Sequence, residues 1–341
     1  MEASMISGRG IAMRECVLKC ERRIAELGAR RGSVLTSRAT TGLAIALAAL
    51  GPEKGSGVVL PVMVCATVVY AVKGAGMRPV FADVEAQEGG IGISLAAARR
   101  CLEKDGKCSA LLAIPLFGGE VDRDGLSGLA SEFGLLVVED AAQAGLVRKQ
   151  KGFGACSVVS FGRGKVGAAG TGGAVLSDDV GLLERVRTIL GVRHEHEARM
   201  AGVAGVAAKV LIALEGLEAE VEGRLRMAEE YRRRLGQEGA MHIGKALPVW
   251  KYSVLVRDQE ARDRITRALL ERAIEATNLY PPLTRWFAGV EGEEYEGAKG
   301  LYDRIVNLPL WSDEGMGERA QLEEWSERTL EAVEGVFAEV R

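Results

Sequence analysis

The sequence lacks a strong excess of charge of either sign. It contains 44 Lys and Arg residues against 47 Asp and Glu residues, which gives a net charge of -3. Proteins that bind nucleic acid or anionic membranes through charge carry a basic surface or a basic tail. The composition gives no such signal. We therefore expect neither nucleic acid nor a membrane among the partners.

Signals for export and membrane insertion are also missing. Residues 1–20 lack the uninterrupted apolar core and the small-residue cleavage site of a secretory signal. The most apolar later stretch, Met200–Leu214, is too short to span a bilayer and contains Lys209. We therefore expect a cytoplasmic protein.

Residues that commonly bind metals are few. The six cysteines are scattered, and reduced thiols are the default in a chain without an export signal. Cys16 and Cys20 are spaced for one face of a helix, but no second ligand pair accompanies them. His194-Glu195-His196 lies in polar surroundings, and no third ligand follows at a recognisable spacing. We expect no metal site and interpret this His-Glu-His segment as a solvated loop.

An alternation of short apolar runs with helix-length amphipathic segments extends from about Val34 to Leu190. This pattern predicts an α/β fold with a mostly parallel sheet covered by helices on both faces. The predicted strands are Gly57–Leu60, Pro79–Ala82, Ala110–Ile114, Leu135–Glu139, Ser157–Phe161 and Gly173–Leu176. The predicted helices are Thr41–Leu50, Val64–Gly74, Leu95–Glu103, Arg123–Phe133 and Val180–Leu190.

The pattern changes after the last of these helices. Apolar residues at helical spacing predict one long connecting helix over Val206–Leu235. A strand over Val249–Val256, a helix over Ala261–Ala273 and a last helix from about Gly317 follow. We therefore predict a large domain over residues 1–235 and a small α+β domain over residues 236–341.

Two residues at predicted strand ends carry the chemistry. Asp140 ends one apolar run, and Lys165 lies in the turn Ser160–Lys165 that leaves another. Ligands of parallel sheets collect beyond the carboxyl ends of the strands. A lysine that bonds to an aldehyde and an acid that keeps a pyridine nitrogen charged are the two requirements of pyridoxal phosphate (PLP) chemistry.

The residues around this pair leave simpler interpretations open. Asp140 could be an ordinary helix cap. The two alanines before Gln143 favour instead a flat cofactor close to the backbone, with the Gln143 amide reaching its hydroxyl. In Thr36–Gly42, Thr40 could cap the following helix or help its first N–H groups to hold a phosphate.

Nucleotide-binding motifs fit this region poorly. Gly162–Gly167 matches G-x-G-x-x-G, but a strand follows it where a dinucleotide site needs a helix. A phosphate-binding P-loop fails as well, because position 159 is Val where Gly is needed and Val166 stands where Ser or Thr is needed.

Taken in order, the motifs resemble those of the DegT/StrS family of PLP-dependent sugar aminotransferases. The resemblance runs over most of the chain and implies fold type I, with a seven-stranded, mostly parallel sheet in the large domain. The matching segments are Ala39-Thr40, Ala46–Gly51, Leu60-Pro61, Ala66-Thr67, Gly74–Gly76, Pro79–Asp83, Glu139–Ala144, Ser160-Phe161 with Lys165, Gly172-Gly173, Tyr280–Leu283 and Leu308–Leu310.

This resemblance implies a role for each matching residue. Lys165 would bond to PLP and shuttle the proton, and Asp140 would pair with the pyridine nitrogen. Gln143 would contact the ring hydroxyl.

The resemblance also implies which groups hold the cofactor phosphate and how the chains assemble. Ser160, Thr40 and the backbone amide of Ala39 would hold the phosphate. The family forms homodimers in which each chain completes the other's active site.

The chain departs from the family pattern in several places. Arg38-Ala39-Thr40 replaces the usual Ser-Gly-Thr, and Pro115 replaces a common histidine. Val64 or Cys65 stands where an aromatic residue usually stacks on PLP. No Gly-x-Asn-x-Arg segment follows Leu190.

We expect an aminotransferase that moves an amino group from an amino acid such as glutamate to a keto-sugar carried on a nucleotide. The departures keep two alternatives open. The first is the same reaction on a non-sugar ketone, such as a cyclitol or a natural-product intermediate. The second is a fold relative that acts as a sensor or partner without turnover.

Overall fold

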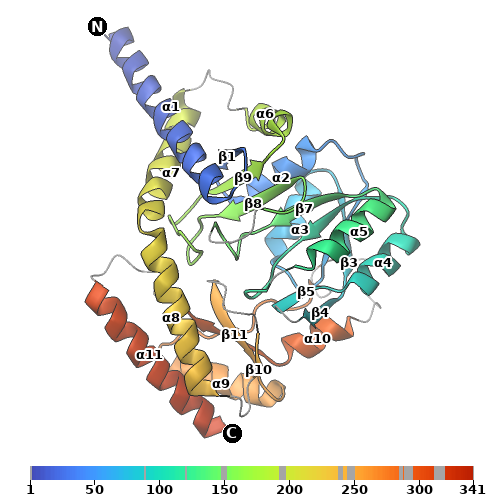
Figure 1. Ribbon diagram of the computed structural model, residues 1–341, viewed down its shortest axis with the longest axis vertical. Helices are drawn as coiled ribbons and strands as arrows, with labels where there is room; N and C mark the ends of the chain where they lie inside the picture. Colours follow the sequence, from blue (N-terminus) through green and yellow to red (C-terminus); the bar gives the residue numbers. More distant parts are fainter. Residues whose placement is uncertain are drawn as a thin grey trace.

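A seven-stranded sheet forms the centre of the computed structural model (Figure 1). The model describes residues 2–87, 90–119, 121–146, 152–191, 197–236, 241–243, 250–283, 287, 295–310 and 319–340. The strand order is β1-β9-β8-β7-β6-β2-β3. Strands β3, β2, β6, β7 and β8 run parallel to one another, and β9 runs antiparallel to both β8 and β1. The predicted α/β class with a mostly parallel sheet is confirmed.

The strands of this sheet are short and mostly buried, as expected when helices cover both faces. Their bounds are β1 (Gly32–Thr36), β2 (Gly57–Pro61), β3 (Arg78–Ala82), β6 (Cys108–Ala113), β7 (Leu136–Asp140), β8 (Cys156–Ser160) and β9 (Gly173–Ser177). The ranges expected from the sequence correspond to six of these seven strands and omit β1.

Alternate strand residues face opposite layers of helices. Val34, Val158 and Val175 pack in the same core cluster as residues of α2 (Ala39–Ala49), α3 (Ala66–Gly74) and α6 (Val180–Ile189). Their neighbours Leu35 and Val159 pack in a second cluster with residues of α1 (Glu2–Leu27) and α7 (Glu197–Glu215). Helices α4 (Leu95–Lys104) and α5 (Arg123–Phe133) cover the strands on the β2 and β6 side.

A smaller sheet lies below the first in Figure 1, with strand order β10-β11-β12 and antiparallel pairing. Its core includes residues of three helices and of the sheet itself. The elements are α8 (Leu217–Leu235), β10 (Met241–His242), β11 (Lys251–Leu255), α9 (Gln259–Glu271), β12 (Ile305–Pro309) and α11 (Arg319–Val340). The division into domains at residue 235 stays a prediction.

A hairpin that follows β3 contacts a short helix that precedes β12 of the smaller sheet. The hairpin consists of β4 (Val84–Gln87) and β5 (Gly90–Ile93). The Asp83 carboxylate before it accepts the N–H groups of Gly297 and Ala298, at 2.9 and 2.8 Å, in the first turn of α10 (Glu296–Tyr302). Asp83 therefore caps a helix that lies more than 200 residues later in the chain.

The single helix predicted over Val206–Leu235 is wrong. Two helices occupy the region, α7 and α8, and they are separated at Gly216, which has φ -91° and ψ 1°. These angles lie in the bridge region outside the α-helical range, and glycine is the residue least committed to a helix. Leucines on both sides keep the helical spacing, which is why the pattern conceals the break.

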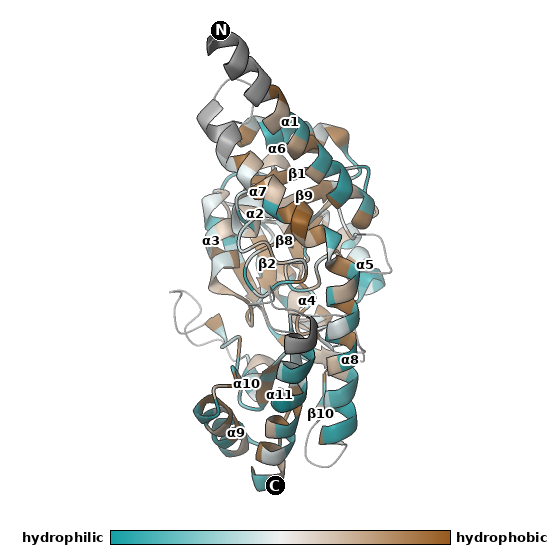
Figure 2. Cartoon of the chain, turned by 90° about the vertical axis from the view of Figure 1, so that its left-hand side faces the viewer, coloured by the Kyte–Doolittle hydropathy of each residue, from teal (hydrophilic) through white to brown (hydrophobic). Residues whose placement is uncertain are grey.

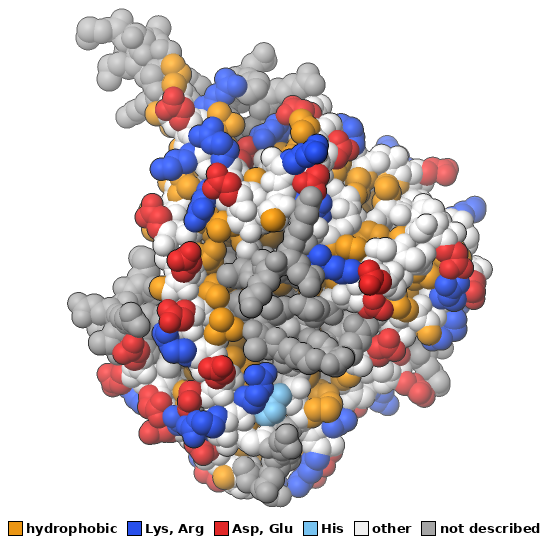
Figure 3. Space-filling view, viewed as in Figure 1, with side chains coloured by type: hydrophobic (Ala, Val, Ile, Leu, Met, Phe, Trp, Pro, Cys, Tyr) orange, Lys and Arg blue, Asp and Glu red, His pale blue; other side chains and the backbone are white. Residues whose placement is uncertain are grey.

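Surface character agrees with the composition. Apolar residues concentrate on interior strands such as β2 and β8, while much of the visible surface of α8 is hydrophilic (Figure 2). Acidic and basic side chains are interspersed over the face drawn in Figure 3. Among the described residues, none of the helices has the length and apolar character that crossing a membrane requires.

Candidate active site

Asp140 and Lys165 lie at the same edge of the main sheet. Strand β7 ends with Asp140 and pairs in parallel with β8, with Asp140 opposite Val158. The turn that carries Lys165 follows β8, so both residues leave at the carboxyl ends of neighbouring strands. The charge of Lys165 acts on the Asp140 carboxyl group. The structure therefore brings the two predicted residues together.

The Asp140 carboxyl group is buried, and this burial raises its pKa above the ordinary value. The Ala142 N–H, which donates to Oδ1 at 3.0 Å, and the charge of Lys165 both lower the pKa, while Glu139 raises it. Burial has the largest effect, so the ionised carboxylate is costly here. A cationic group facing it would remove that cost, and the protonated nitrogen of a pyridine ring is such a group.

The turn that carries Lys165 is tight. The Lys165 N–H donates to the Gly162 carbonyl at 3.1 Å. Gly164 and Gly167 have φ values of +77° and +73°, which favour glycine. The Lys165 Nζ atom lies 3.8 Å from the centroid of the Trp250 ring. The face of the Trp250 ring thus stabilises the Lys165 ammonium group. Trp250 directly precedes a strand of the smaller sheet.

Gln143 is buried and oriented by the backbone. Its Oε1 atom accepts the Phe117 N–H at 2.9 Å. Because an N–H group must face an oxygen, this bond identifies the amide orientation and leaves Nε2 as the donor. Tyr280 is a further hydrogen-bond partner of the Gln143 side chain, and burial raises the pKa of the Tyr280 hydroxyl.

Three aromatic rings line the region around Lys165 and Gln143. Tyr280 lies between Trp250 and Phe117, with ring centroids 6.1 Å apart in both pairs. The sequence has no aromatic residue at Val64 or Cys65, where one usually stacks on PLP. No sequence motif pointed to Trp250 as an aromatic residue of the site. Trp250 directly precedes β11, 85 residues after Lys165. Only the tertiary fold brings it to the lysine.

Ser160, Ala39 and Thr40 gather where β8, β9 and α2 meet. Ser160 pairs with Gly173, and a Cβ atom on Gly173 would lie 2.4 Å from the Ala39 nitrogen. Arg38 is the N-cap of α2, and its side chain makes no capping bond to the first-turn N–H groups. Such a helix start binds anions readily.

The simpler interpretation of Thr40 as a helix cap is wrong, because Thr40 lies inside the first turn of α2. The capping interpretation of Asp140 is also incomplete. Asp140 accepts the Ala142 N–H, but the residues described after it, 141–146, form turns.

The described residues fit PLP in their chemistry. An amine and a buried carboxylate are electrostatically coupled. A buried amide is oriented with Nε2 as its donor, and a helix start beside Ser160 lacks a side-chain cap. The individual roles of these residues stay predictions.

Two segments were considered above as metal ligands, and of these only the one with Cys16 and Cys20 lies within the described residues. His194-Glu195-His196 lies outside the described residues. Within the described residues, His, Cys, Asp and Glu form no group of three suited to a metal. Burial raises the pKa of the Cys20 thiol to about 12, so the thiol is protonated at neutral pH.

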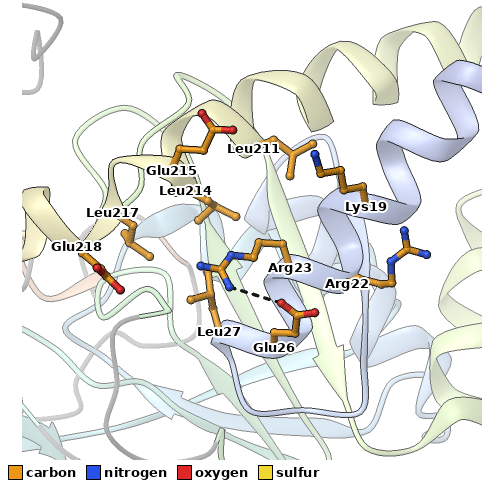
Figure 4. Close-up of a pocket in the computed structure, with 10 residues that line it drawn as sticks. All are labelled: Lys19, Arg22, Arg23, Glu26, Leu27, Leu211, Leu214, Glu215, Leu217 and Glu218. Atoms are coloured by element: carbon orange, nitrogen blue, oxygen red, sulfur yellow. Dashed lines mark hydrogen bonds and ion pairs between the residues drawn. The ribbon is translucent and has the colours of Figure 1, made fainter.

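A separate groove of about 470 Å³ runs between α1 and the junction of α7 with α8 (Figure 4). Leu214 and Leu217 line it, and the same leucines lie 3.7 and 3.4 Å from the position of a Cβ atom on Gly167. The groove is therefore behind the lysine turn and outside the candidate active site. Its other lining residues are Lys19, Arg22, Arg23, Glu26, Leu27, Leu211, Glu215 and Glu218.

Comparison with known proteins identifies the family of this chain. The model of the DegT/DnrJ/EryC1/StrS aminotransferase family matches residues 2–321. The chain is 26% identical to GDP-perosamine synthase of Escherichia coli O157:H7 over 329 residues, which cover 91% of this chain and 87% of the relative. It is 31% identical to dTDP-3-amino-3,4,6-trideoxy-alpha-D-glucose transaminase of Streptomyces venezuelae, covering 85% and 82%.

A solved structure shares the fold of this chain. The crystal structure of DesI in the presence of its TDP-sugar product superposes with a TM-score of 0.80 at 22% identity, covering 98% of this chain and 89% of DesI.

Proposed function

Since the chain belongs to the DegT/DnrJ/EryC1/StrS family of PLP-dependent aminotransferases, we propose that it transfers an amino group from an amino acid to a keto-sugar carried on a nucleotide. The coupling of buried Asp140 with Lys165 at one sheet edge is the observation that carries the proposal. The printed names of the two relatives, a GDP-linked and a dTDP-linked aminosugar enzyme, support the substrate class.

Each site residue has a task that its surroundings suit. PLP, when bound, supplies a ring that draws electrons away from the substrate α-carbon. Lys165 Nζ would hold the cofactor, and the same amine would move the proton between the substrate α-carbon and the cofactor carbon. Asp140 keeps the proton on the ring nitrogen, and Gln143 Nε2 donates to the ring hydroxyl.

The phosphate end of the site has its own group of donors. The Ser160 and Thr40 hydroxyls and the Ala39 N–H hold the phosphate at the start of α2, where the helix dipole favours an anion. Glutamate is the proposed amino donor, and a cytoplasmic homodimer is the proposed form of the enzyme.

Substitution of the lysine tests the proposal. We expect Lys165→Ala to lose the visible chromophore of the bound cofactor and to lower turnover by at least about 10⁴-fold, because the same amine bonds to the cofactor and moves the proton. Absorption spectra with added PLP and an aminotransfer assay measure both. Lys54→Ala, on the exposed loop before β2, serves as the control. Full turnover with an unchanged chromophore in the Lys165→Ala protein would end the proposal.

A panel of acceptors then separates the substrate classes. Turnover of nucleotide-linked keto-sugars supports the proposal, and turnover of cyclitol or other non-sugar ketones alone contradicts it. The half-reaction with glutamate separates an enzyme from a sensor. Conversion of the bound cofactor to its pyridoxamine form shows transfer chemistry, and an unchanged spectrum with every amino acid tested contradicts it.

A further inference from the structure

A largely buried ion pair lies in the N-terminal half of α8 and includes none of the residues assigned above. The Arg224 side chain is only 1% exposed and the Glu220 side chain 18%. Arg224 Nε and Nη2 both lie 2.9 Å from Glu220 Oε1. Two buried charges need a specific reason, because taking them out of water costs more than many such pairs return in stability.

The pair bonds to both sides of the lysine turn. Glu220 Oε2 accepts the Gly167 N–H at 3.0 Å, and Arg224 Nη2 donates to the Gly164 carbonyl at 3.4 Å. Gly164 directly precedes Lys165, and Gly167 follows it by two residues. One helix turn therefore holds the backbone on either side of the lysine.

The same guanidinium also reaches the aromatic residue that contacts the amine. Arg224 Nη1 donates to the Trp250 carbonyl at 3.4 Å. The Trp250 ring lies 3.8 Å from Lys165 Nζ, measured to its centroid. Arg224 thus ties together the backbone that carries the lysine and the ring that faces its ammonium group.

We propose that the Glu220–Arg224 pair is a positioning device for the Lys165 amine, an inference that rests on the proposed function. A lysine side chain has four rotatable bonds, so the position of its amine depends on how firmly the backbone turn that carries it is held. Displacing a reacting group by about 1 Å can cost about 10²-fold in rate. The pair acts through Lys165 and touches neither cofactor nor substrate.

The test uses Glu220→Gln, which keeps an acceptor oxygen but removes the charge that compensates Arg224. Apoprotein is mixed with PLP, and the visible absorbance follows condensation of the Lys165 amine with the aldehyde, which releases one water. We expect condensation to slow by at least about 10-fold and kcat to fall by about 10²-fold, with the donor KM changed less than about threefold, because positioning and not donor binding is lost.

A matched control pair lies two residues further along the same helix. Glu222 and Arg226 have the same i,i+4 spacing, with Nη1 and Oε1 3.0 Å apart, but they are 68% and 46% exposed. Glu222→Gln and Arg226→Met are expected to leave the condensation rate and kcat unchanged. Arg224→Lys keeps the positive charge but loses the planar, forked arrangement of N–H donors. It is expected to slow condensation less than Arg224→Gln does.

Two further results decide the inference. If Glu220→Gln does not fold, the double variant Glu220→Gln/Arg224→Gln removes the uncompensated charge and is expected to fold with slow condensation. Condensation and kcat at wild-type values in the folded variants overturn the inference. Failure of the proposed function looks different, because wild-type protein itself would then form no chromophore with PLP.

Discussion

Asp140 is placed where its charge opposes folding. Its carboxyl group is buried at the end of β7, and burial raises its pKa above the 3.8 of an ordinary aspartate. Between 3.8 and the folded-state pKa, the folded chain binds more protons than the unfolded chain. The contribution of Asp140 to stability therefore falls as the pH rises through the folded pKa. A residue that costs stability without its cationic partner is typical of a functional site.

Removing this charge is expected to stabilise the apoprotein. Asp140→Asn keeps an oxygen for the Ala142 N–H, so the variant should melt at a higher temperature than wild type at pH 7. The gap should close as the pH falls towards 3.8, where both side chains are neutral. Thermal melting of the apoproteins between pH 7 and pH 3.8 measures this difference in melting temperature. Asp124→Asn, at an exposed position, is the control. A lower melting temperature for Asp140→Asn at pH 7 would contradict the assignment of a costly charge.

At the same scale, the sequence predicts some site residues and misses others for a physical reason. Asp140 and Lys165 can be found because parallel strands end at a common edge, so strand ends alone bring them together. Glu220 and Arg224 have the same spacing as the exposed pair Glu222 and Arg226. Only burial distinguishes the two pairs, and burial depends on what the fold packs against each.

Strand β9 shows how one element shapes the site. It runs antiparallel between β1 and β8, and Gly173 at its start lies against the first residue of α2. A Cβ atom there would meet the Ala39 nitrogen at 2.4 Å and the Ala39 Cα at 2.7 Å. Backbone atoms of a helix start cannot easily move aside. The glycine thus allows the helix start to approach Ser160.

Gly173→Ala is accordingly expected to destabilise the protein by about 1–3 kcal/mol, the usual range for overpacking, and to weaken cofactor binding. Gly128→Ala provides the matched comparison, because Gly128 lies exposed within α5 with nothing within 4 Å of the added Cβ. It should stabilise by about 0.5–1 kcal/mol through helix propensity. Urea unfolding and PLP titration of both variants check this. Equal effects of the two substitutions would contradict the close approach.

Element bounds follow the sequence where local signals mark them. Helix α5 begins and ends as predicted, because the Asp122 side chain accepts the Gly125 N–H and Gly134 adopts a left-handed C-cap. Strand β1 was missed because Gly32 and Ser33 open it, and neither residue favours strands. The break at Gly216 was hidden by leucines that keep their spacing through it.

At the scale of the whole molecule, the paired helices α1 and α7 leave large apolar side chains exposed. Ile11 on α1 is 60% exposed and Ile212 on α7 is 69% exposed. In the proposed homodimer, we expect a second copy of the chain to cover these residues.

We expect sedimentation to give a mass about twice the 36.3 kDa of one chain. Ile212→Glu should shift the mass towards one chain, because a buried charge without a partner opposes association. Exposed Glu218→Gln, on α8, is the control. A single-chain mass at every concentration, together with full activity, would rule out the dimer.

Helix α8 belongs to two cores at once. Leu217 and Val221 pack with residues of α1 and α7, whereas Met227 and Tyr231 pack with the smaller sheet. A fragment that ends with α8 would therefore expose the apolar side chains that pack against the smaller sheet, and it would be prone to aggregate. The two halves of this enzyme are thus poor candidates for separate expression, recombination with relatives or exchange as modules.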